Sequence, residues 1–214
     1  MENISRTVLD AAMNYQAYRQ LGEDLLTDKG IPFPGNYSDS MLGYTELNNA
    51  RMNRLDKTTK LSEEAREKLT LIQQPIIWLT LTEPWCGDAA QILPALNKLA
   101  ESNDHIQLRF ILRDMHLGIM DAFLTGNSRS IPKVIILDAH SLEVLDSWGP
   151  RPSELQAIII PMIQEMKSYS DKDLRKQKYQ AYQIEAQRWY NKDKTESIQR
   201  EILESTLHAI TAKV

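Results

Sequence analysis

Cysteine is nearly absent from this chain, which has one cysteine, Cys86, among 214 residues. A single cysteine excludes a disulfide within the chain and a structural zinc site built from several cysteines of one chain. The four histidines, at positions 105, 116, 140 and 208, are scattered and show no ligand spacing. We therefore expect no bound metal. One thiol suits a reducing compartment, although a disulfide to another molecule stays possible.

Excess positive charge and long hydrophobic runs are also missing. The formal net charge is -4 and the isoelectric point is about 5.6, so nucleic acid and anionic membranes are not expected as partners. No apolar run is long enough to span a bilayer, and the first residues lack the basic and then apolar pattern of a signal sequence. These absences predict a cytoplasmic protein. They give no indication of its oligomeric state.

The most informative motif that is present is Trp85-Cys86-Gly87-Asp88-Ala89. A continuous apolar run, Ile76 to Leu81, precedes it and predicts a buried strand, and apolar residues at helical spacing follow from Gln91 to Ala100. Cys86 is therefore expected at a helix N-terminus, where the helix dipole favours a thiolate. Asp88 caps the same helix end but opposes a second negative charge, so the direction of the net pKa shift of Cys86 stays open.

Together with later motifs, this stretch resembles the thioredoxin-like family, in the branch with a single cysteine. Pro94 falls where thioredoxins kink the helix after the cysteine, Ser130-Ile131-Pro132-Lys133 resembles the cis-proline segment, and Gly149 resembles the glycine of a facing loop. The resemblance covers roughly residues 71–168. It implies an α/β fold with a central mixed sheet, built as βαβ followed by ββα.

Two departures from the family limit the chemistry that the resemblance implies. Ala89 stands where thioredoxins have their second, resolving cysteine, and Thr80 stands where they usually bury an aspartate. Both missing groups serve the resolution of a mixed disulfide. Dithiol thioredoxin activity is therefore not expected.

The resemblance also implies a substrate groove around Cys86. It predicts a cis Ile131–Pro132 bond opposite Cys86, with the Ile131 backbone pairing with an extended peptide or with glutathione. The chemical candidate is Cys86 itself. The expected groove residues are Trp85, Gly87, Asp88, Arg129, Ile131, Pro132, Lys133 and Gly149, with Arg151 as the weakest candidate. Each of the cations among them is equally well explained as ordinary solvated charge.

Helical patterns flank the thioredoxin-like domain, and we expect a helical extension at 1–70, the domain at 71–168 and a second helical extension at 169–214. Residues 4–28 predict one amphipathic helix, 39–55 a second, and a third opens at Ser62. Within the domain, strands are expected at 106–112, 134–137 and 143–148. A short helix is expected at 117–124, and the last domain helix, opened by a Ser153 to Gln156 capping box, should cover the sheet.

The C-terminal extension has an aromatic stripe on its first helix, formed by Tyr179, Tyr182, Ala186 and Trp189. Packing against the N-terminal helices is the favoured interpretation of this stripe, and a groove for a partner is the alternative.

Three functional hypotheses follow. The leading one is a monothiol redox protein in which Cys86 attacks a protein or peptide disulfide or a glutathionylated thiol, with glutathione as a co-substrate. The second is a binding module that kept the peptide groove and lost redox turnover. The third is a glutathione-dependent iron–sulfur cluster shared between two chains. A hydrolase using His116 has little support, because nothing in the sequence places that histidine beside Cys86.

Overall fold

A four-stranded sheet forms the centre of the protein, whose computed structural model describes residues 4–27 and 37–212. The strands are β1 (Ile76–Thr82), β2 (Ile106–Leu112), β3 (Lys133–Asp138) and β4 (Val144–Trp148), in the order β2-β1-β3-β4. β1 and β2 are parallel, whereas β3 is antiparallel to both β1 and β4. The predicted mixed sheet, with βαβ followed by an antiparallel hairpin, is confirmed.

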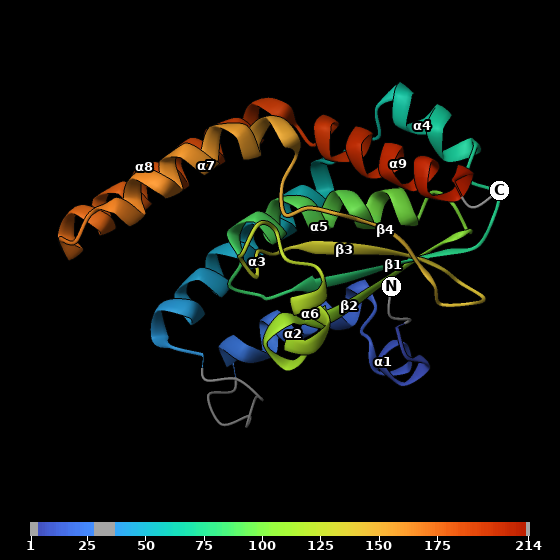
Figure 1. Cartoon of the computed structure of the whole chain (residues 1–214), viewed down its shortest axis with the longest axis horizontal. Coiled ribbons are helices and arrows are strands. Elements are labelled where there is room, and N and C mark those ends of the chain that lie inside the picture. Colours follow the sequence, from blue (N-terminus) through green and yellow to red (C-terminus); the bar gives the residue numbers. More distant parts are fainter. Residues whose placement is uncertain (1–3, 28–36, 213–214) are drawn as a thin grey trace.

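Helices cover both faces of this sheet (Figure 1). α5 (Gly87–Ala100) and α9 (Glu196–Thr211) lie on one face, and α2 (Tyr15–Thr27) and α6 (Leu117–Ala122) lie on the other. A short 3₁₀ turn, η1 (Arg113–Met115), joins β2 to α6. Every residue of β1 is buried, as expected for a central strand covered on both faces. This strand ends just before the motif that contains Cys86.

The N-terminal segment differs from the prediction of a single helix over residues 4–28. α1 (Arg6–Ala11) ends before α2 begins, and residue 28 lies outside the described residues. Between the two helices, Met13 donates its backbone N–H to the Phe110 carbonyl over 2.9 Å and accepts the Phe110 N–H over 2.8 Å. The chain breaks the helix because this extended residue pairs with the edge strand β2, which helical periodicity cannot reveal.

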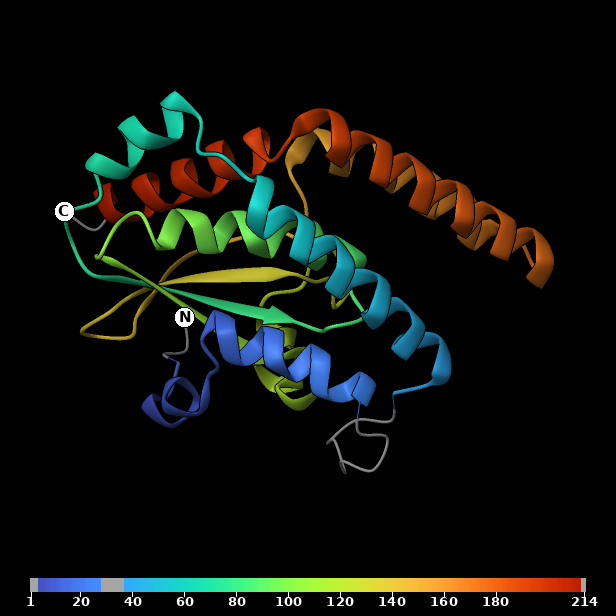
Figure 2. The same cartoon turned by 180° about the vertical axis from the view of Figure 1, so that it is seen from behind.

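The next two helices form as predicted. α3 (Asp39–Thr58) runs alongside α5 and packs against α2 (Figure 2). α4 (Glu63–Thr70) begins at the expected place, because the Ser62 hydroxyl accepts the Ala65 N–H and caps the helix. α3 thereby stands beside the N-terminus of α5, where Cys86 lies.

The last predicted domain helix does not cover the sheet. α7 (Ser153–Ser168) packs mainly against α8 (Lys172–Asp193), and the two project beyond the sheet as a helical hairpin (Figure 1). α9 packs on β4 and α5 in its place. The broad apolar face of α7 indicated that the helix is packed, but it could not indicate whether the packing partner is a sheet or a second helix.

The expected capping box of α7 is also absent. Ser153 is the first helical residue and not the N-cap, which is Pro152. The backbone N–H of Ser153 instead donates to the Glu201 carboxylate of α9, over 2.9 Å and 3.0 Å. The cap comes from a distant helix, so a local sequence motif could not identify it.

Candidate functional site

A cavity of about 410 Å³ opens beside Cys86. Its walls come from the first turn of α5, the segment before β3, and facing side chains of α3 and α8. Seven of the predicted site residues line it: Trp85, Cys86, Gly87, Asp88, Arg129, Ile131 and the weakest candidate, Arg151. Cavities of this size commonly hold small molecules. The structure therefore brings most of the predicted groove together around one hollow.

Cys86 is the N-cap of α5 and its side chain forms part of the cavity wall. The residue is 7 % exposed, and its Sγ donates to the Ile131 carbonyl oxygen over 3.4 Å. Burial, followed by the charge of Asp88, raises the pKa of the Cys86 thiol to about 12, although the N–H groups of Ala89 and Asp88 and the Arg151 charge oppose the shift. The net pKa shift of Cys86, whose direction the sequence left open, is thus upward, and Cys86 rests as a thiol.

The sequence suggested that Asp88 caps α5, but its side chain does not do so. Its Oδ2 instead pairs with Arg151 Nη2 at 2.7 Å, and its Oδ1 accepts the Tyr190 hydroxyl at 2.9 Å. Both ion-pair side chains are 10 % exposed. Arg151 also donates to the Tyr182 hydroxyl over 2.7 Å. Arg151, the weakest candidate in the sequence, is therefore a central part of the site, because it neutralises the carboxylate next to Cys86.

The segment before β3 has the predicted cis Ile131–Pro132 bond. Behind it, Gly149 adopts a φ of +110°, and a Cβ atom there would lie 2.5 Å from the Pro132 carbonyl oxygen. Lys133 is buried, and its Nζ donates to the Gly149 carbonyl over 3.0 Å. Pro132, Lys133 and Gly149 therefore support the cavity wall from behind and do not line the cavity. Burial lowers the pKa of Lys133.

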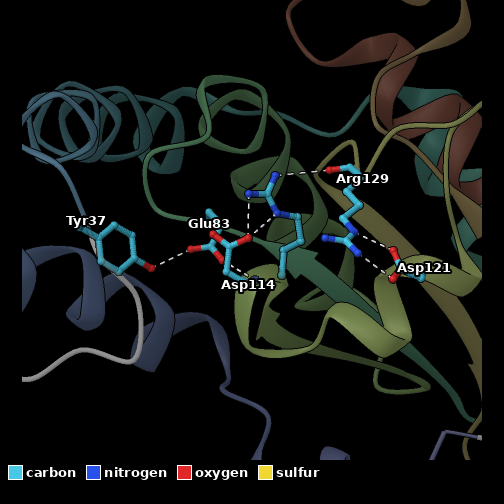
Figure 3. A network of polar contacts seen from close by, with 6 residues as sticks. Tyr37, Glu83, Asp114, Asp121 and Arg129 are labelled. Atoms are coloured by element: carbon cyan, nitrogen blue, oxygen red, sulfur yellow. Dashed lines mark hydrogen bonds and ion pairs between the residues drawn. The ribbon is translucent and has the colours of Figure 1, made fainter.

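A polar network runs along the edge of the cavity (Figure 3). The buried carboxylate of Glu83 accepts the Tyr37 hydroxyl at 2.7 Å and the Asp114 N–H at 2.9 Å, and burial raises its pKa. The Asp114 side chain pairs in turn with Arg113 at 2.8 Å. Arg113 lies 4.9 Å over the Trp85 ring, so the network holds one cation and one aromatic side chain at the cavity.

Arg129 joins this network through its backbone. Its carbonyl accepts a hydrogen bond from Arg113 Nη1 over 3.3 Å, and its guanidinium makes two bonds to the Asp121 carboxylate, over 2.6 Å and 2.8 Å. Both side chains of the Arg129–Asp121 pair are about half exposed. Arg129 therefore lines the cavity as a paired surface cation.

Thr80 lies below the motif on β1, where the sequence lacks the aspartate usual in thioredoxins. The residue is fully buried and its hydroxyl has no hydrogen-bond partner. A hydroxyl cannot accept a proton as a carboxylate does. The proton acceptor missing from the sequence is thus also missing at that place in the structure.

Part of the aromatic stripe of α8 faces the cavity, and part of it, Ala186 and Trp189, is buried in the hydrophobic core. Tyr179, Tyr182 and Ala186 are lining residues, and Tyr190 adds a further ring, whereas Trp189 does not line the cavity. Gln187 anchors α8 to α5 by accepting from Gln91 over 2.9 Å. The stripe therefore contributes both to the core and to the cavity wall, and whether it binds a partner stays a prediction.

Sequence reasoning missed several lining residues, because they lie far from the motif in the chain. Arg51 and Tyr44 belong to α3, and Arg113 follows β2. Within residues 4–27 and 37–212, no group of three or more histidine, cysteine or carboxylate side chains could hold a metal ion. Over the same residues, no helix is both long and apolar enough to cross a bilayer.

The sheet order, the cysteine at the start of α5 and the cis-proline segment opposite it define a thioredoxin-fold protein with a single, buried cysteine. A family model described as Thioredoxin matches residues 35–167, more than half of the chain, and the chain belongs to that family. No match was found among the curated proteins.

Two solved structures resemble the protein over nearly its whole length. One is described as a protein of unknown function, PA1234 from Pseudomonas aeruginosa, with 18 % identity, 99 % of both chains covered and a TM-score of 0.53. The other is described as an HIV epitope-scaffold, with 18 % identity, 98 % of this chain and 99 % of that chain covered, and a TM-score of 0.53. At this identity the likeness concerns the fold, helical extensions included.

Proposed function

We propose that this protein is a thioredoxin-fold binding module that holds a ligand in the Cys86 cavity and does not turn over disulfides. The observation that carries this proposal is the hydrogen bond from Cys86 Sγ to the Ile131 carbonyl. A sulfur that donates a hydrogen bond is protonated. Disulfide exchange requires the thiolate, so a protonated Cys86 is unreactive. The raised pKa of the Cys86 thiol leaves the thiol as the dominant form at neutral pH.

The chain also lacks the groups that complete a dithiol cycle. It has no second cysteine, Ala89 stands at the resolving position, and the buried Thr80 replaces the usual proton acceptor. The cavity itself is retained, with Ile131 and the rings of α8 in its walls. Retention of the groove without the redox groups favours binding over turnover.

The test is the rate of Cys86 alkylation by iodoacetamide as a function of pH, in the native full chain and in the unfolded chain as reference. We expect slow alkylation at neutral pH that rises only above the ordinary thiol value of about 8.5, because the folded protein disfavours the thiolate. We also expect no reduction of a glutathionylated peptide in the presence of glutathione. Rapid alkylation with a midpoint below about 8.5 would contradict the proposal.

Monothiol exchange is the second candidate, favoured by the position of Cys86 opposite the cis-proline segment and at the start of α5. In this cycle the Cys86 thiolate attacks the glutathione sulfur of a glutathionylated thiol, forms a disulfide with glutathione and releases the substrate thiolate. A second glutathione then attacks that disulfide, forms glutathione disulfide and restores the Cys86 thiolate. Turnover by the wild type that Cys86→Ser abolishes would establish this cycle.

The iron–sulfur hypothesis has less geometric support than either. Cluster ligation between two chains needs a sulfur open to a second molecule, and Cys86 is 7 % exposed with its thiol directed at Ile131. It therefore stays a prediction of the sequence. Anaerobic reconstitution that gave no visible absorption bands would dismiss it.

A further inference from the structure

The Cys86 cavity has more positive than negative charge in its walls. Four arginines line it, at positions 51, 113, 129 and 151, against one carboxylate, Asp88. Asp88 is already satisfied by Arg151 and by the Tyr190 hydroxyl. The carboxylates that pair with Arg113 and Arg129, Asp114 and Asp121, are not among the lining residues. Cationic side chains therefore outnumber carboxylates in the cavity lining, and those of Arg113, Arg129 and Arg151 are already paired.

Arg51 is the cation that most clearly needs a counter-charge. It makes no ion pair within residues 4–27 and 37–212, and its Nη1 donates to Asn48 Oδ1 over 3.0 Å. Burial and the charge of Arg54 lower its pKa, although Asp88 opposes the shift. A half-buried guanidinium without a carboxylate gains from an anion.

The place of Arg51 directs such an anion towards the cysteine motif. Arg51 Nη1 is 3.7 Å from the position that a Cβ atom of Gly87 would occupy, so the guanidinium lies over the first turn of α5. The N-terminal end of a helix adds positive potential there. Two independent sources of positive potential, Arg51 and the start of α5, therefore meet at the same wall of the cavity.

The cavity lining also contains aromatic side chains that suit a flat or apolar body. Tyr44, Tyr179, Tyr182 and Tyr190 line the cavity together with Trp85. The Tyr179 and Tyr182 rings are tilted towards each other with centroids 5.6 Å apart. Aromatic walls favour ring-shaped ligands, because offset and edge contacts add to the burial of apolar surface. A volume of about 410 Å³ matches a small molecule.

We propose that the Cys86 cavity binds a small organic oxyanion, a carboxylate or a phosphate on a flat ring, with Arg51 taking the oxyanion and the tyrosines of α3 and α8 enclosing the ring. This inference rests on the proposed binding function and names its ligand class. The alternative is that Arg51 is a solvated surface cation that binds no ligand, and the experiments below distinguish the two.

The first experiment compares Cys86 alkylation by iodoacetate, an anion, with alkylation by neutral iodoacetamide at the same pH. Both reagents use the same thiolate, so the ratio of their rates reports the potential beside Cys86. We expect Arg51→Gln to lower the iodoacetate to iodoacetamide ratio about three- to tenfold, as the loss of one nearby charge should. Arg54→Gln is the matched control, because Arg54 lies on the same helix outside this cavity and should leave the ratio unchanged.

The second experiment measures protection of Cys86 from iodoacetamide by three ring compounds: 4-hydroxyphenylacetate, phenyl phosphate and tyramine. We expect either or both anions to slow alkylation of the wild type at least about fivefold, and the cation tyramine to give no protection. Protection should be lost in Arg51→Gln and kept in Arg54→Gln. The two anions distinguish a carboxylate from a phosphate as the preferred group.

The inference is overturned if the rate ratio is the same in both variants and the wild type, or if tyramine protects as well as the anions do. Its failure is separate from that of the proposed function. The rate ratio and the protection are relative quantities, whereas the proposed function depends on the absolute alkylation rate and on turnover of a glutathionylated peptide. A fast, Cys86-dependent turnover would overturn only the proposed function if Arg51→Gln still lowered the rate ratio and abolished protection by the anions.

Discussion

Gly149 and Pro132 bring two loops into contact directly behind the wall that faces Cys86. Gly149 has a φ of +110°, a conformation that side chains with a Cβ rarely adopt, and the Pro132 carbonyl occupies the space where that Cβ would lie. The Gly149 carbonyl also accepts from Lys133. The position of Ile131, and through it the thiol hydrogen bond of Cys86, depends on a residue without a side chain.

Gly149→Ala is expected to destabilise the protein by about 2 kcal/mol or more, because the new Cβ would lie 2.5 Å from a backbone oxygen in a strained conformation. Urea unfolding measures the change. Gly118→Ala, on α6, is the control, since nothing lies within 4 Å of its Cβ position. That change should be neutral or stabilising by up to about 1 kcal/mol. Equal effects of the two substitutions would contradict this account of Gly149.

At the scale of single elements, the start of α7 is held by α9. The Glu201 carboxylate accepts from the Ser153 N–H, from the Ser153 hydroxyl at 2.6 Å and from Trp148 Nε1 at 3.1 Å. A carboxylate at a helix N-terminus also interacts favourably with the helix dipole. Glu201 therefore joins β4, α7 and α9 at the base of the helical hairpin.

Glu201→Gln should lower the free energy of unfolding by about 1–2 kcal/mol, because the amide keeps the shape but loses the charge that three donors share. Glu204→Gln, on the same helix, is the matched control. Its carboxylate is about half exposed and pairs with Lys68, so the expected cost is below about 1 kcal/mol. Chemical denaturation of both variants and the wild type gives the comparison. A cost at Glu201 no larger than at Glu204 would argue against this cap.

At the scale of the whole molecule, burial is distributed unevenly. The buried residues of α7 are Leu155 and Ile159, and those of α8 are Ala186, Trp189 and Tyr190, so all of them lie near the base of the hairpin. Towards the tip, α7 has no buried residue after Ile159, and Tyr179 of α8 is exposed. The far half of the hairpin has little core to hold it, and it forms one wall of the Cys86 cavity.

Hydrogen exchange of the native protein should follow this gradient. We expect amides in the far half of the hairpin, at about 162–183, to exchange at least about 100-fold faster than those of β1 and α9. α9 is the control within the same measurement, because α7 and α9 are both 16 residues long and differ in burial. Equal protection of the two helices would show that the hairpin opens only when the whole protein unfolds.

The sequence by itself indicated a mixed sheet built as βαβ and ββα, the place of Cys86 at the start of a helix and, through the resemblance to thioredoxins, the cis-proline segment. These features follow from local patterns: the apolar run of β1, the helical spacing after the motif and the Ser130–Lys133 segment. Local patterns failed at Met13, where pairing with Phe110 breaks a helical period, and at α7, whose apolar face meets a helix in place of the sheet.

Only the tertiary structure decided the chemistry of the site. Asp88 pairs with Arg151 and accepts a hydrogen bond from Tyr190, which is 102 residues away in the chain. Arg51 reaches the motif because α3 packs along α5. The direction of the Cys86 pKa shift depends on burial and on these charges together. Such terms depend on distances between elements remote in the sequence, which periodicity and motif spacing do not contain.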